Sequence, residues 1–330
     1  MRVAFTYNLK TSHDEDQAEF DTPETVAMLE GALRELGHEV ALVEASGSVR
    51  ELVGALEAAR PELIFNTAEG GVGRGREAYY PALYERLGIP FTGSDAYVCT
   101  VTLDKHLTKL LVAQRGVRVP GWIFVRGAAD VAAAANLRFP VIVKPNFEGS
   151  SKGITAASVV EDRASLERRV AAELPRFPEG LLVEEYIVGR DVVVPYLEAA
   201  SPETGGMLDP AEYVYRGDAR RYAIFELDMK QRGFHDVEVR SPARLDDATR
   251  SAVMDASRAA IEVLGVRDLG RMDFRVTDGG EAYFLEMNAL PSLEPGASIY
   301  LSGARAGLDG VTGVVEAVVT SAVRRYARAS

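Results

Sequence analysis

The chain of 330 residues contains a single cysteine, Cys99, so it can form neither an intrachain disulfide nor a cysteine-cluster metal site. It has no dense tract of lysine or arginine, and its formal net charge of −12 argues against a nucleic-acid or anionic-membrane surface. No apolar run approaches the ~20 residues that a membrane-spanning helix needs. Residues 1–8 are typical of a strand, without the basic stretch of a signal peptide. We therefore expect a cytoplasmic protein whose partners are small molecules.

What the chain does have is the composition of a soluble globular protein, 47% hydrophobic and 26% charged. Its length exceeds the roughly 250–300 residues at which a single hydrophobic core stops growing. We therefore expect more than one domain, and the pattern of predicted elements indicates three: residues 1–95, 96–180 and 181–330.

The first domain is predicted to be Rossmann-like, because short apolar runs alternate with helical patterns along it. Such alternation is typical of a parallel sheet with helices on its faces. The expected strands are 3–7, 39–43 and 63–66, and the expected helices are 22–36 and 49–59.

The second and third domains are predicted to mix strands and helices without that regular alternation. In the second, a small α+β lobe, we expect helices at 103–115, 128–137 and 162–173 and strands at 121–125, 141–144 and 154–159. In the third we expect strands at 181–186, 192–197, 223–227, 270–276 and 282–287 and helices near 246–264 and 309–327. Residues 201–221 are polar without periodicity and are predicted to be a loop over a site.

The most informative segment is a predicted hairpin at residues 270–288. Asp-Gly-Gly at 278–280 lies between two alternating runs, which is a strong hairpin signal. Period-two alternation assigns one set of side chains to a buried face: Met272, Phe274, Val276, Tyr283, Leu285 and Met287. The opposite face then carries Arg271, Asp273, Ala282, Phe284, Glu286 and Asn288.

Two carboxylates and an amide oxygen on this face are ligands that suit Mg²⁺, which usually completes its coordination with water and substrate phosphates. An arginine beside such an ion can stabilise the negative charge that develops on a tetrahedral intermediate. The same alternation also fits a hairpin whose polar face meets only water. The pattern alone leaves both interpretations open.

Two further segments have the composition of a nucleotide site. An apolar strand ends at Lys144, and in the loop 148–153 that follows, backbone N–H groups and serine hydroxyls can cover a triphosphate. The Walker A spacing is absent. A second apolar strand runs into Glu184 and Glu185, which can accept hydrogen bonds from adenine and ribose. Each segment, taken alone, also fits a plain turn or an edge strand.

Taken in this order, the segments resemble the D-alanine–D-alanine ligase branch of the ATP-grasp superfamily. The similarity begins around Gly70, and its most specific motifs are Gly270–Phe274 and Leu285–Pro291. The resemblance implies an ATP-grasp fold with α/β and α+β parts: a Rossmann-like pre-ATP-grasp domain, a small central α+β lobe and a C-terminal lobe with an antiparallel sheet. It also implies ATP and Mg²⁺ as cofactors, with Mn²⁺ as the alternative ion, and a homodimer.

The resemblance further implies roles for individual residues. It places around ATP the residues Lys105, Lys144, Ser150, Ser151, Glu184, Glu185, Tyr186, Ile187, Asp191 and Lys230. It places at the metal ion Asp273, Glu286 and Asn288, and it assigns catalysis to Arg271 and Lys230. The implied reaction has two steps: a carboxylate attacks the γ-phosphate to give an acyl phosphate, and an amine then displaces the phosphate.

The amino-acid pocket departs from the pattern of this family. Residues 7–15 stand where the family has a glycine-rich stretch and a glutamate, and Gly75-Arg76-Glu77-Ala78 stands where it has Gly-Glu-Asp-Gly. The Tyr-Asp-Tyr that precedes the third lysine is also missing. The candidates for substrate binding are Glu15, Arg76, Glu77 and Ser292. An arginine in place of an acid suggests a substrate with an additional carboxylate, since arginine binds carboxylates bidentately.

These observations support one function and leave two alternatives. The favoured function is a ligase that joins two amino acids or similar substrates and releases ADP and phosphate, without D-alanine as both substrates. The first alternative is D-alanine–D-alanine ligation itself. The second is a nucleotide-binding regulator without catalysis, which the presence of Arg271 argues against. The sequence does not identify the acid, the amine or their chirality.

Overall fold

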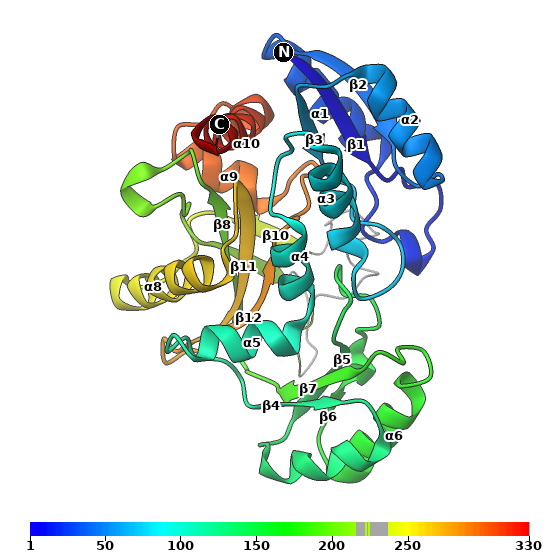
Figure 1. Cartoon of the computed structure of the whole chain (residues 1–330). Helices are drawn as coiled ribbons and strands as arrows, with labels where there is room; N and C mark the ends of the chain where they lie inside the picture. Colours follow the sequence, from blue (N-terminus) through cyan, green and yellow to red (C-terminus); the bar gives the residue numbers. More distant parts are fainter. Residues whose placement is uncertain (216–221, 223, 225–236, 330) are drawn as a thin grey trace.

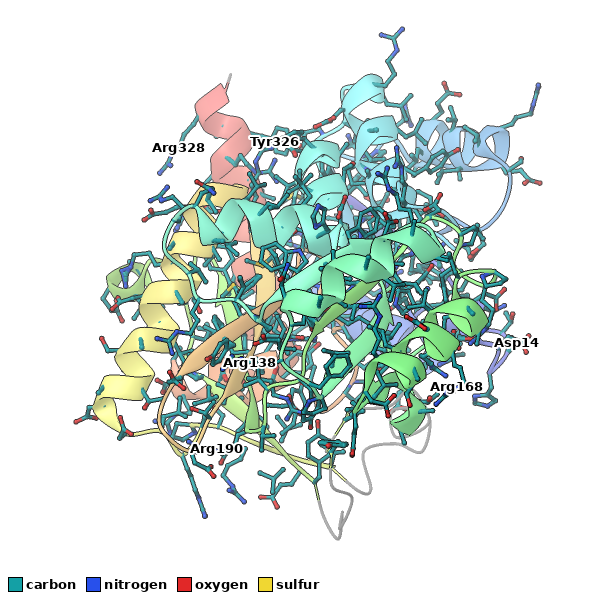
Figure 2. All side chains as sticks on the ribbon, turned by 90° about the horizontal axis from the view of Figure 1, so that it is seen from below. Asp14, Arg138, Arg168, Arg190, Tyr326 and Arg328 are labelled. Atoms are coloured by element: carbon teal, nitrogen blue, oxygen red, sulfur yellow. The ribbon has the colours of Figure 1, made fainter. Side chains whose placement is uncertain are left out.

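The computed structural model describes residues 1–215, 222, 224 and 237–329. These residues form three β-sheets that follow one another along the chain, and Figure 1 shows them as three bodies around a common centre. Charged side chains such as Asp14, Arg168, Arg190 and Arg328 point outward at the periphery (Figure 2). The predicted boundaries near residues 95 and 180 separate these sheets only approximately, as the pairing below shows.

The N-terminal sheet is parallel, with the order β2-β1-β3, as its alternating pattern predicts. Its strands are β1 (Arg2–Tyr7), β2 (Glu39–Glu44) and β3 (Leu63–Asn66). Its helices are α1 (Pro23–Glu35), α2 (Val49–Ala59) and α3 (Arg76–Leu87), of which α3 was not among the predicted elements. Helix α1 begins where the Thr22 side chain accepts a hydrogen bond from the Thr25 N–H, with Pro23 in its first turn.

The central sheet is antiparallel and has the order β4-β7-β5-β6. Its strands are β4 (Trp122–Val125), β5 (Val141–Pro145), β6 (Val159–Val160) and β7 (Leu181–Glu185), and helix α6 (Arg163–Glu173) packs on it. Because β7 lies between β4 and β5, the strand predicted at 181–186 belongs to this sheet and not to the third.

Two elements of the central lobe differ from the prediction. Residues 128–136 form a 3₁₀ helix (η2, Ala128–Asn136) instead of an α-helix, and its two buried side chains, Val131 and Ala134, have the three-residue spacing that a 3₁₀ helix aligns. The strand expected at 154–159 is replaced by a short 3₁₀ turn (η3, Ala156–Ser158) before β6. There the Ser158 hydroxyl accepts a hydrogen bond from the Thr155 N–H, which favours a turn over an extended strand.

The C-terminal sheet is antiparallel, and its described strands have the order β10-β9-β8-β11-β12. They are β8 (Arg190–Leu197), β9 (Ala211–Tyr215), β10 (Val237–Arg240), β11 (Leu269–Val276) and β12 (Ala282–Asn288). The prediction of a loop over 201–221 is wrong in part: it contains a 3₁₀ turn (η4, Pro202–Thr204) and β9, whose tyrosines and valine favour an extended strand. The strand predicted at 223–227 falls largely outside the described residues.

One face of the C-terminal sheet is covered by helices α4 (Ala96–Leu103), α5 (Lys105–Ala113) and α8 (Asp247–Leu264), which share a hydrophobic cluster with its strands. The prediction of one helix at 103–115 is corrected here, because the chain breaks at Asp104. The Asp104 side chain accepts a hydrogen bond from the Leu107 N–H and so begins a new helix. Arg271, Asp273 and Glu286 lie on the opposite face of the sheet and line a pocket.

The two C-terminal helices connect the third sheet to the first. They are α9 (Ser298–Arg305), which was not predicted, and α10 (Gly310–Ala329). Val314, Val315 and Val318 of α10 lie in one hydrophobic cluster with Phe5 of β1 and Leu33 of α1. Among the described residues no single helix is long and apolar enough to cross a membrane; α9 and α10 meet that test only as a pair, bent by 87°.

Candidate active site

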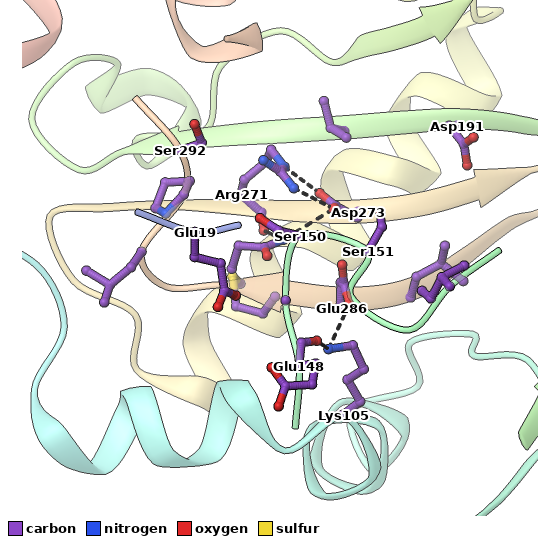
Figure 3. Close-up of a pocket in the computed structure, with 18 of the residues that line it drawn as sticks. Glu19, Lys105, Glu148, Ser150, Ser151, Asp191, Arg271, Asp273, Glu286 and Ser292 are labelled. Carbon is purple, nitrogen blue, oxygen red and sulfur yellow. Dashed lines mark hydrogen bonds and ion pairs between the residues drawn. The ribbon is translucent and has the colours of Figure 1, made fainter. Parts of the chain in front are cut away.

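A cavity of about 270 Å³ opens between the three sheets. Most of the predicted site residues line it: Glu77, Lys105, Lys144, Ser150, Ser151, Glu184, Glu185, Tyr186, Ile187, Asp191, Arg271, Asp273, Glu286, Asn288 and Ser292. Glu15 and Arg76 are not among the lining residues. Lys230 lies outside the described residues. The pocket therefore gathers side chains from segments that are far apart in the sequence (Figure 3).

The hairpin that carries the predicted metal ligands contains a β-bulge. The pairing shifts after Asp273, which pairs with Glu286, to Phe274, which pairs with Phe284, so that Leu285 is an extra residue. The predicted faces are therefore wrong at the four residues from Ala282 to Leu285, because Ala282 pairs with the buried Val276 and Tyr283 with Arg275. Phe284 is fully buried against Phe274, and Leu285 lines the pocket. An extra residue reverses the alternation, and simple period-two reasoning has no means of detecting it.

The four polar residues of the hairpin nevertheless converge on the pocket. Arg271 donates from Nε and Nη2 to the two carboxylate oxygens of Asp273, at 2.7 and 2.8 Å. The Asn288 side-chain amide donates to Asp273 Oδ2 at 3.2 Å, and Lys105 Nζ lies 3.3 Å from Glu286 Oε2. Figure 3 shows Arg271 beside Asp273 and Lys105 reaching toward Glu286.

The charge state of Glu286 follows from its cationic neighbours. Burial alone would raise the pKa of Glu286, but Lys105, Lys144 and Arg271 outweigh it and lower that pKa to about 2. The carboxylate is therefore ionised at neutral pH. Two carboxylates and an amide oxygen on adjacent strands fit a hard divalent cation such as Mg²⁺.

A buried cluster of charges joins β5, β7 and α5. Glu184 is 2% exposed, and its carboxylate lies 2.5 Å from Lys144 Nζ and 3.0 Å from Lys109 Nζ. Burial lowers the pKa of the Lys109 ammonium to about 8, because Glu184 offsets only part of the desolvation. Sequence reasoning missed Lys109. Its spacing of four residues from Lys105 on a predicted helix, which places both on one face, is the signal that points to it.

The far end of β7 is held by two arginines. Arg275 lies 3.2 Å from Asp191 and donates to the Tyr186 hydroxyl at 2.8 Å. The Tyr215 hydroxyl also donates to Asp191. Arg138 pairs with Glu185 at 2.7 Å. These contacts fix the segment to which the resemblance assigns adenine and ribose.

The glycine-serine loop 148–153 carries Ser150 and Ser151 at positive φ, 48° and 61°, a region that non-glycine residues rarely adopt. Lys105 Nζ donates to the Glu148 carbonyl and so ties the loop to α5. The Gly153 N–H donates to Glu15 Oε1 at 2.6 Å, so Glu15 restrains this loop from outside the pocket.

Arg76 also restrains the loop. It is 3% exposed, pairs with Glu19 at 2.7 Å and donates to the Phe147 carbonyl at 2.7 Å. Lys152 completes the cluster, 2.6 Å from Glu19. The hypothesis that Arg76 binds a substrate carboxylate is therefore not supported, because its guanidinium is buried against acids and a carbonyl of the chain itself.

The end of the pocket nearest the N-terminal sheet is acidic. Carboxylates that line it come from Glu19, Asp21, Glu69, Glu77 and Glu294, and oxygens of Glu19, Glu69 and Glu77 lie within 4.8 Å of one another. Burial raises the pKa of Asp21 and that of Glu77 to about 7, and it raises the pKa of Glu69 well above its ordinary value. Desolvated acids of this kind favour a proton or a bound cation. Of the five, only Glu77 was predicted.

Comparisons with known proteins bear on this arrangement. The family model for the D-ala D-ala ligase C-terminus matches residues 111–319. The chain is 30% identical over 279 residues to the D-alanine–D-alanine ligase of Aquifex aeolicus, covering 84% of this chain and 88% of that one. It is 29% identical over 303 residues to the uncharacterized protein y4sG of Sinorhizobium fredii, covering 89% and 86%.

Two solved structures are similar in fold. The D-alanine–D-alanine ligase from Bacillus anthracis complexed with ATP superposes over 100% of both chains, with a TM-score of 0.77 at 18% identity. The VanG D-Ala:D-Ser ligase from Enterococcus faecalis gives a TM-score of 0.74 at 17% identity, covering 97% of this chain and 98% of that one. The predicted ATP-grasp fold is confirmed. Because the family model spans more than half of the chain, the chain belongs to the D-alanine–D-alanine ligase family and is an ATP-dependent ligase.

Proposed function

We propose that this enzyme joins two amino acids or amino-acid-like substrates through an acyl phosphate, with Mg²⁺ or alternatively Mn²⁺, and that D-alanine does not serve as both substrates. One contrast carries the proposal. The described residues assigned to phosphates and metal line one pocket together, whereas segments 7–15 and 75–78, which contribute Lys10 and Glu77 to that pocket, depart from the family's sequence pattern.

One end of the pocket carries the groups proposed to bind the phosphates, the metal ion and the tetrahedral intermediate. Lys105 and Lys144 offer positive charge to the phosphates, and the loop 148–153 offers backbone and hydroxyl donors. Mg²⁺, held by Asp273, Glu286 and Asn288, would neutralise phosphate charge. Arg271 supplies a fixed positive charge for the oxyanion of the tetrahedral intermediate. Lys230, although outside the described residues, keeps its proposed part in catalysis.

The bonds change in two steps. A substrate carboxylate oxygen attacks the γ-phosphorus, and the bond from that phosphorus to ADP breaks. The neutral amine nitrogen of the second substrate then attacks the acyl carbon, phosphate leaves, and the nitrogen loses a proton. Catalysis of this kind depends on positioning and charge neutralisation, which buried ion pairs such as Lys144–Glu184 provide.

The acidic end suits the ammonium group of an amino acid, because Glu69 and Glu77 line it beside Glu19, whose own charge is already paired with Arg76 and Lys152. Glu77 and Ser292, which line the pocket, remain the proposed substrate-binding residues from the sequence. D-Alanine–D-alanine ligation is the second candidate, because the Aquifex relative bears that name.

The test is ATP-dependent phosphate release from pooled amino acids, followed by single acids and pairs with mass spectrometry of the product. We expect release with at least one pair other than D-alanine alone. Turnover with D-alanine as sole substrate, at the rate of the best pair, would establish the second candidate instead. Absence of ATP-dependent release with every pool would contradict both. A homodimer is also proposed, and light scattering after size exclusion tests it.

A further inference from the structure

Lys109 is a fully buried lysine that does not line the pocket. It lies on α5, and its ammonium reaches two other elements. Lys109 Nζ donates to the Leu285 carbonyl at 2.8 Å and to the Phe284 carbonyl at 3.4 Å, both on β12. On β7 it pairs with Glu184 at 3.0 Å. The ammonium therefore donates to two backbone carbonyls and lies beside one carboxylate.

The two carbonyls belong to the β-bulge. In a regular strand, residues two apart share a face, so Glu286 would lie on the same side as the buried Phe284. The extra residue Leu285 reverses this and turns Glu286 into the pocket, opposite Asp273. The bulge is thus the local feature that builds the metal face, and Lys109 satisfies its carbonyls.

Charge compensation alone does not explain Lys109. Glu184 already pairs with Lys144 at 2.5 Å, so a second lysine is not needed to neutralise it. Burying an ammonium costs free energy, and an apolar side chain would fill this core position at a lower cost.

We infer that Lys109 is a positioning residue: it holds the β-bulge of β12 in place through two backbone carbonyls and thereby orients the Glu286 side chain toward the proposed metal ion. The inference rests on the proposed role of Glu286 in that function. Lys109 does not line the pocket proposed to hold nucleotide and metal, so it acts through the backbone that carries Glu286.

The test compares Lys109→Met with the double variant Lys109→Met/Glu184→Gln. The readout is Mn²⁺ binding in the presence of a non-hydrolysable ATP analogue, followed by electron paramagnetic resonance, with far-UV circular dichroism for folding. We expect the single variant to fold and its Mn²⁺ affinity to fall roughly 10–100-fold, as for other residues that support metal ligands. The double variant is expected not to recover.

Arg115→Met, an exposed change just after α5, is the matched control and is expected to bind Mn²⁺ as the unaltered protein does. Should Lys109→Met not fold, Lys109→Leu, which also lacks a donor, takes its place with the same expected loss. Mn²⁺ affinity within about threefold of the unaltered protein, or recovery in the double variant, would overturn the inference. Because Mn²⁺ binding is measured without turnover, failure of the proposed ligase activity would be recognised separately, by absent phosphate release in the unaltered protein.

Discussion

At the scale of single residues, the site consists of ionisable groups whose charge is set by what surrounds them. Glu286 keeps its negative charge because three cations lower its pKa to about 2 despite burial. Asp21, in contrast, lies where burial outweighs the hydrogen bond from Thr67 and raises its pKa to about 7. A carboxyl group is therefore ionised and able to bind a cation at Glu286, whereas at Asp21, near the other end of the pocket, burial favours the protonated form.

Glu286→Gln tests the first of these roles. The change removes the charge of a proposed metal ligand, so we expect kcat/KM for ATP-dependent phosphate release to fall at least about 100-fold, or about 2.7 kcal/mol in transition-state stabilisation. Steady-state kinetics with Mg²⁺ in excess measures it. Glu281→Gln, at an exposed glutamate of the same hairpin that pairs with Arg118, is the control and should stay near the unaltered rate.

Asp21→Asn tests the second role through the pH dependence of stability. The pKa of Asp21 is raised from 3.8 to about 7 in the folded state. Below about pH 4 the carboxyl is protonated in both the folded and the unfolded state and does not affect stability. Between about pH 4 and pH 7 the unfolded state loses its proton first, so the free energy of unfolding falls as pH rises. The variant should therefore be more stable than the unaltered protein at pH 8, by up to about 4 kcal/mol, and similar to it at pH 4. Urea unfolding at both pH values checks this. Equal differences at the two pH values would refute the assigned protonation.

At the scale of elements, the positions of loops and strand irregularities decide where these residues point. The loop 148–153 approaches the N-terminal segment so closely that a Cβ on Gly149 would overlap Glu19 Oε1. Arg76 and Lys152 hold that acid from either side. The departure from the family motif at residue 76 therefore coincides with a restrained loop 148–153.

Arg76→Met is expected to loosen this loop. It removes one partner of a buried ion pair, which typically costs about 3–5 kcal/mol, although Lys152 remains beside Glu19 and should reduce the loss. We expect the KM for ATP to rise and limited proteolysis near residue 150 to quicken, with the preference among acid substrates unchanged. Arg74→Met, at an exposed neighbour, is the control. A changed acid preference with an unchanged loop would restore the original substrate-binding hypothesis.

Some of these elements could be predicted from local sequence patterns and others could not. Local patterns predicted the parallel sheet, because strands and helices alternate there, and they predicted the hairpin from its Asp-Gly-Gly turn. They could not predict the bulge at Leu285, since its carbonyls are satisfied by Lys109 from a distant helix. For the same reason Glu19, Asp21 and Glu69 were missed, because only the fold brings them to one pocket.

At the scale of the whole molecule, α10 carries polar contacts between the first and third sheets. Asp268, fully buried before β11, accepts from Arg325 at 2.7 Å and from the Ser321 hydroxyl at 2.7 Å, both on α10. The Gly93 N–H donates to the same carboxylate at 2.8 Å. No periodicity within residues 1–95 indicates that a helix beyond residue 310 completes their core.

Asp268→Ala should weaken this connection. It leaves Arg325 and the Gly93 N–H without their carboxylate, and we expect a loss of about 3 kcal/mol, the low end for a broken buried pair, because Arg325 keeps some contact with solvent. Urea unfolding measures it. Asp278→Ala, at the exposed hairpin turn, is the control and should change stability by less than about 0.5 kcal/mol. Equal stability of the two variants would contradict the bridging role.

A crystal structure of the enzyme with Mg²⁺ and a non-hydrolysable ATP analogue is the most direct test of the central claim, that one nucleotide and metal site is built by side chains from α5, the central sheet and the C-terminal sheet. We predict metal density coordinated by Asp273, Glu286 and Asn288, with the terminal phosphates beside Lys105 and Lys144. A nucleotide bound elsewhere, or a metal ion that none of the three hairpin residues contacts, would contradict it.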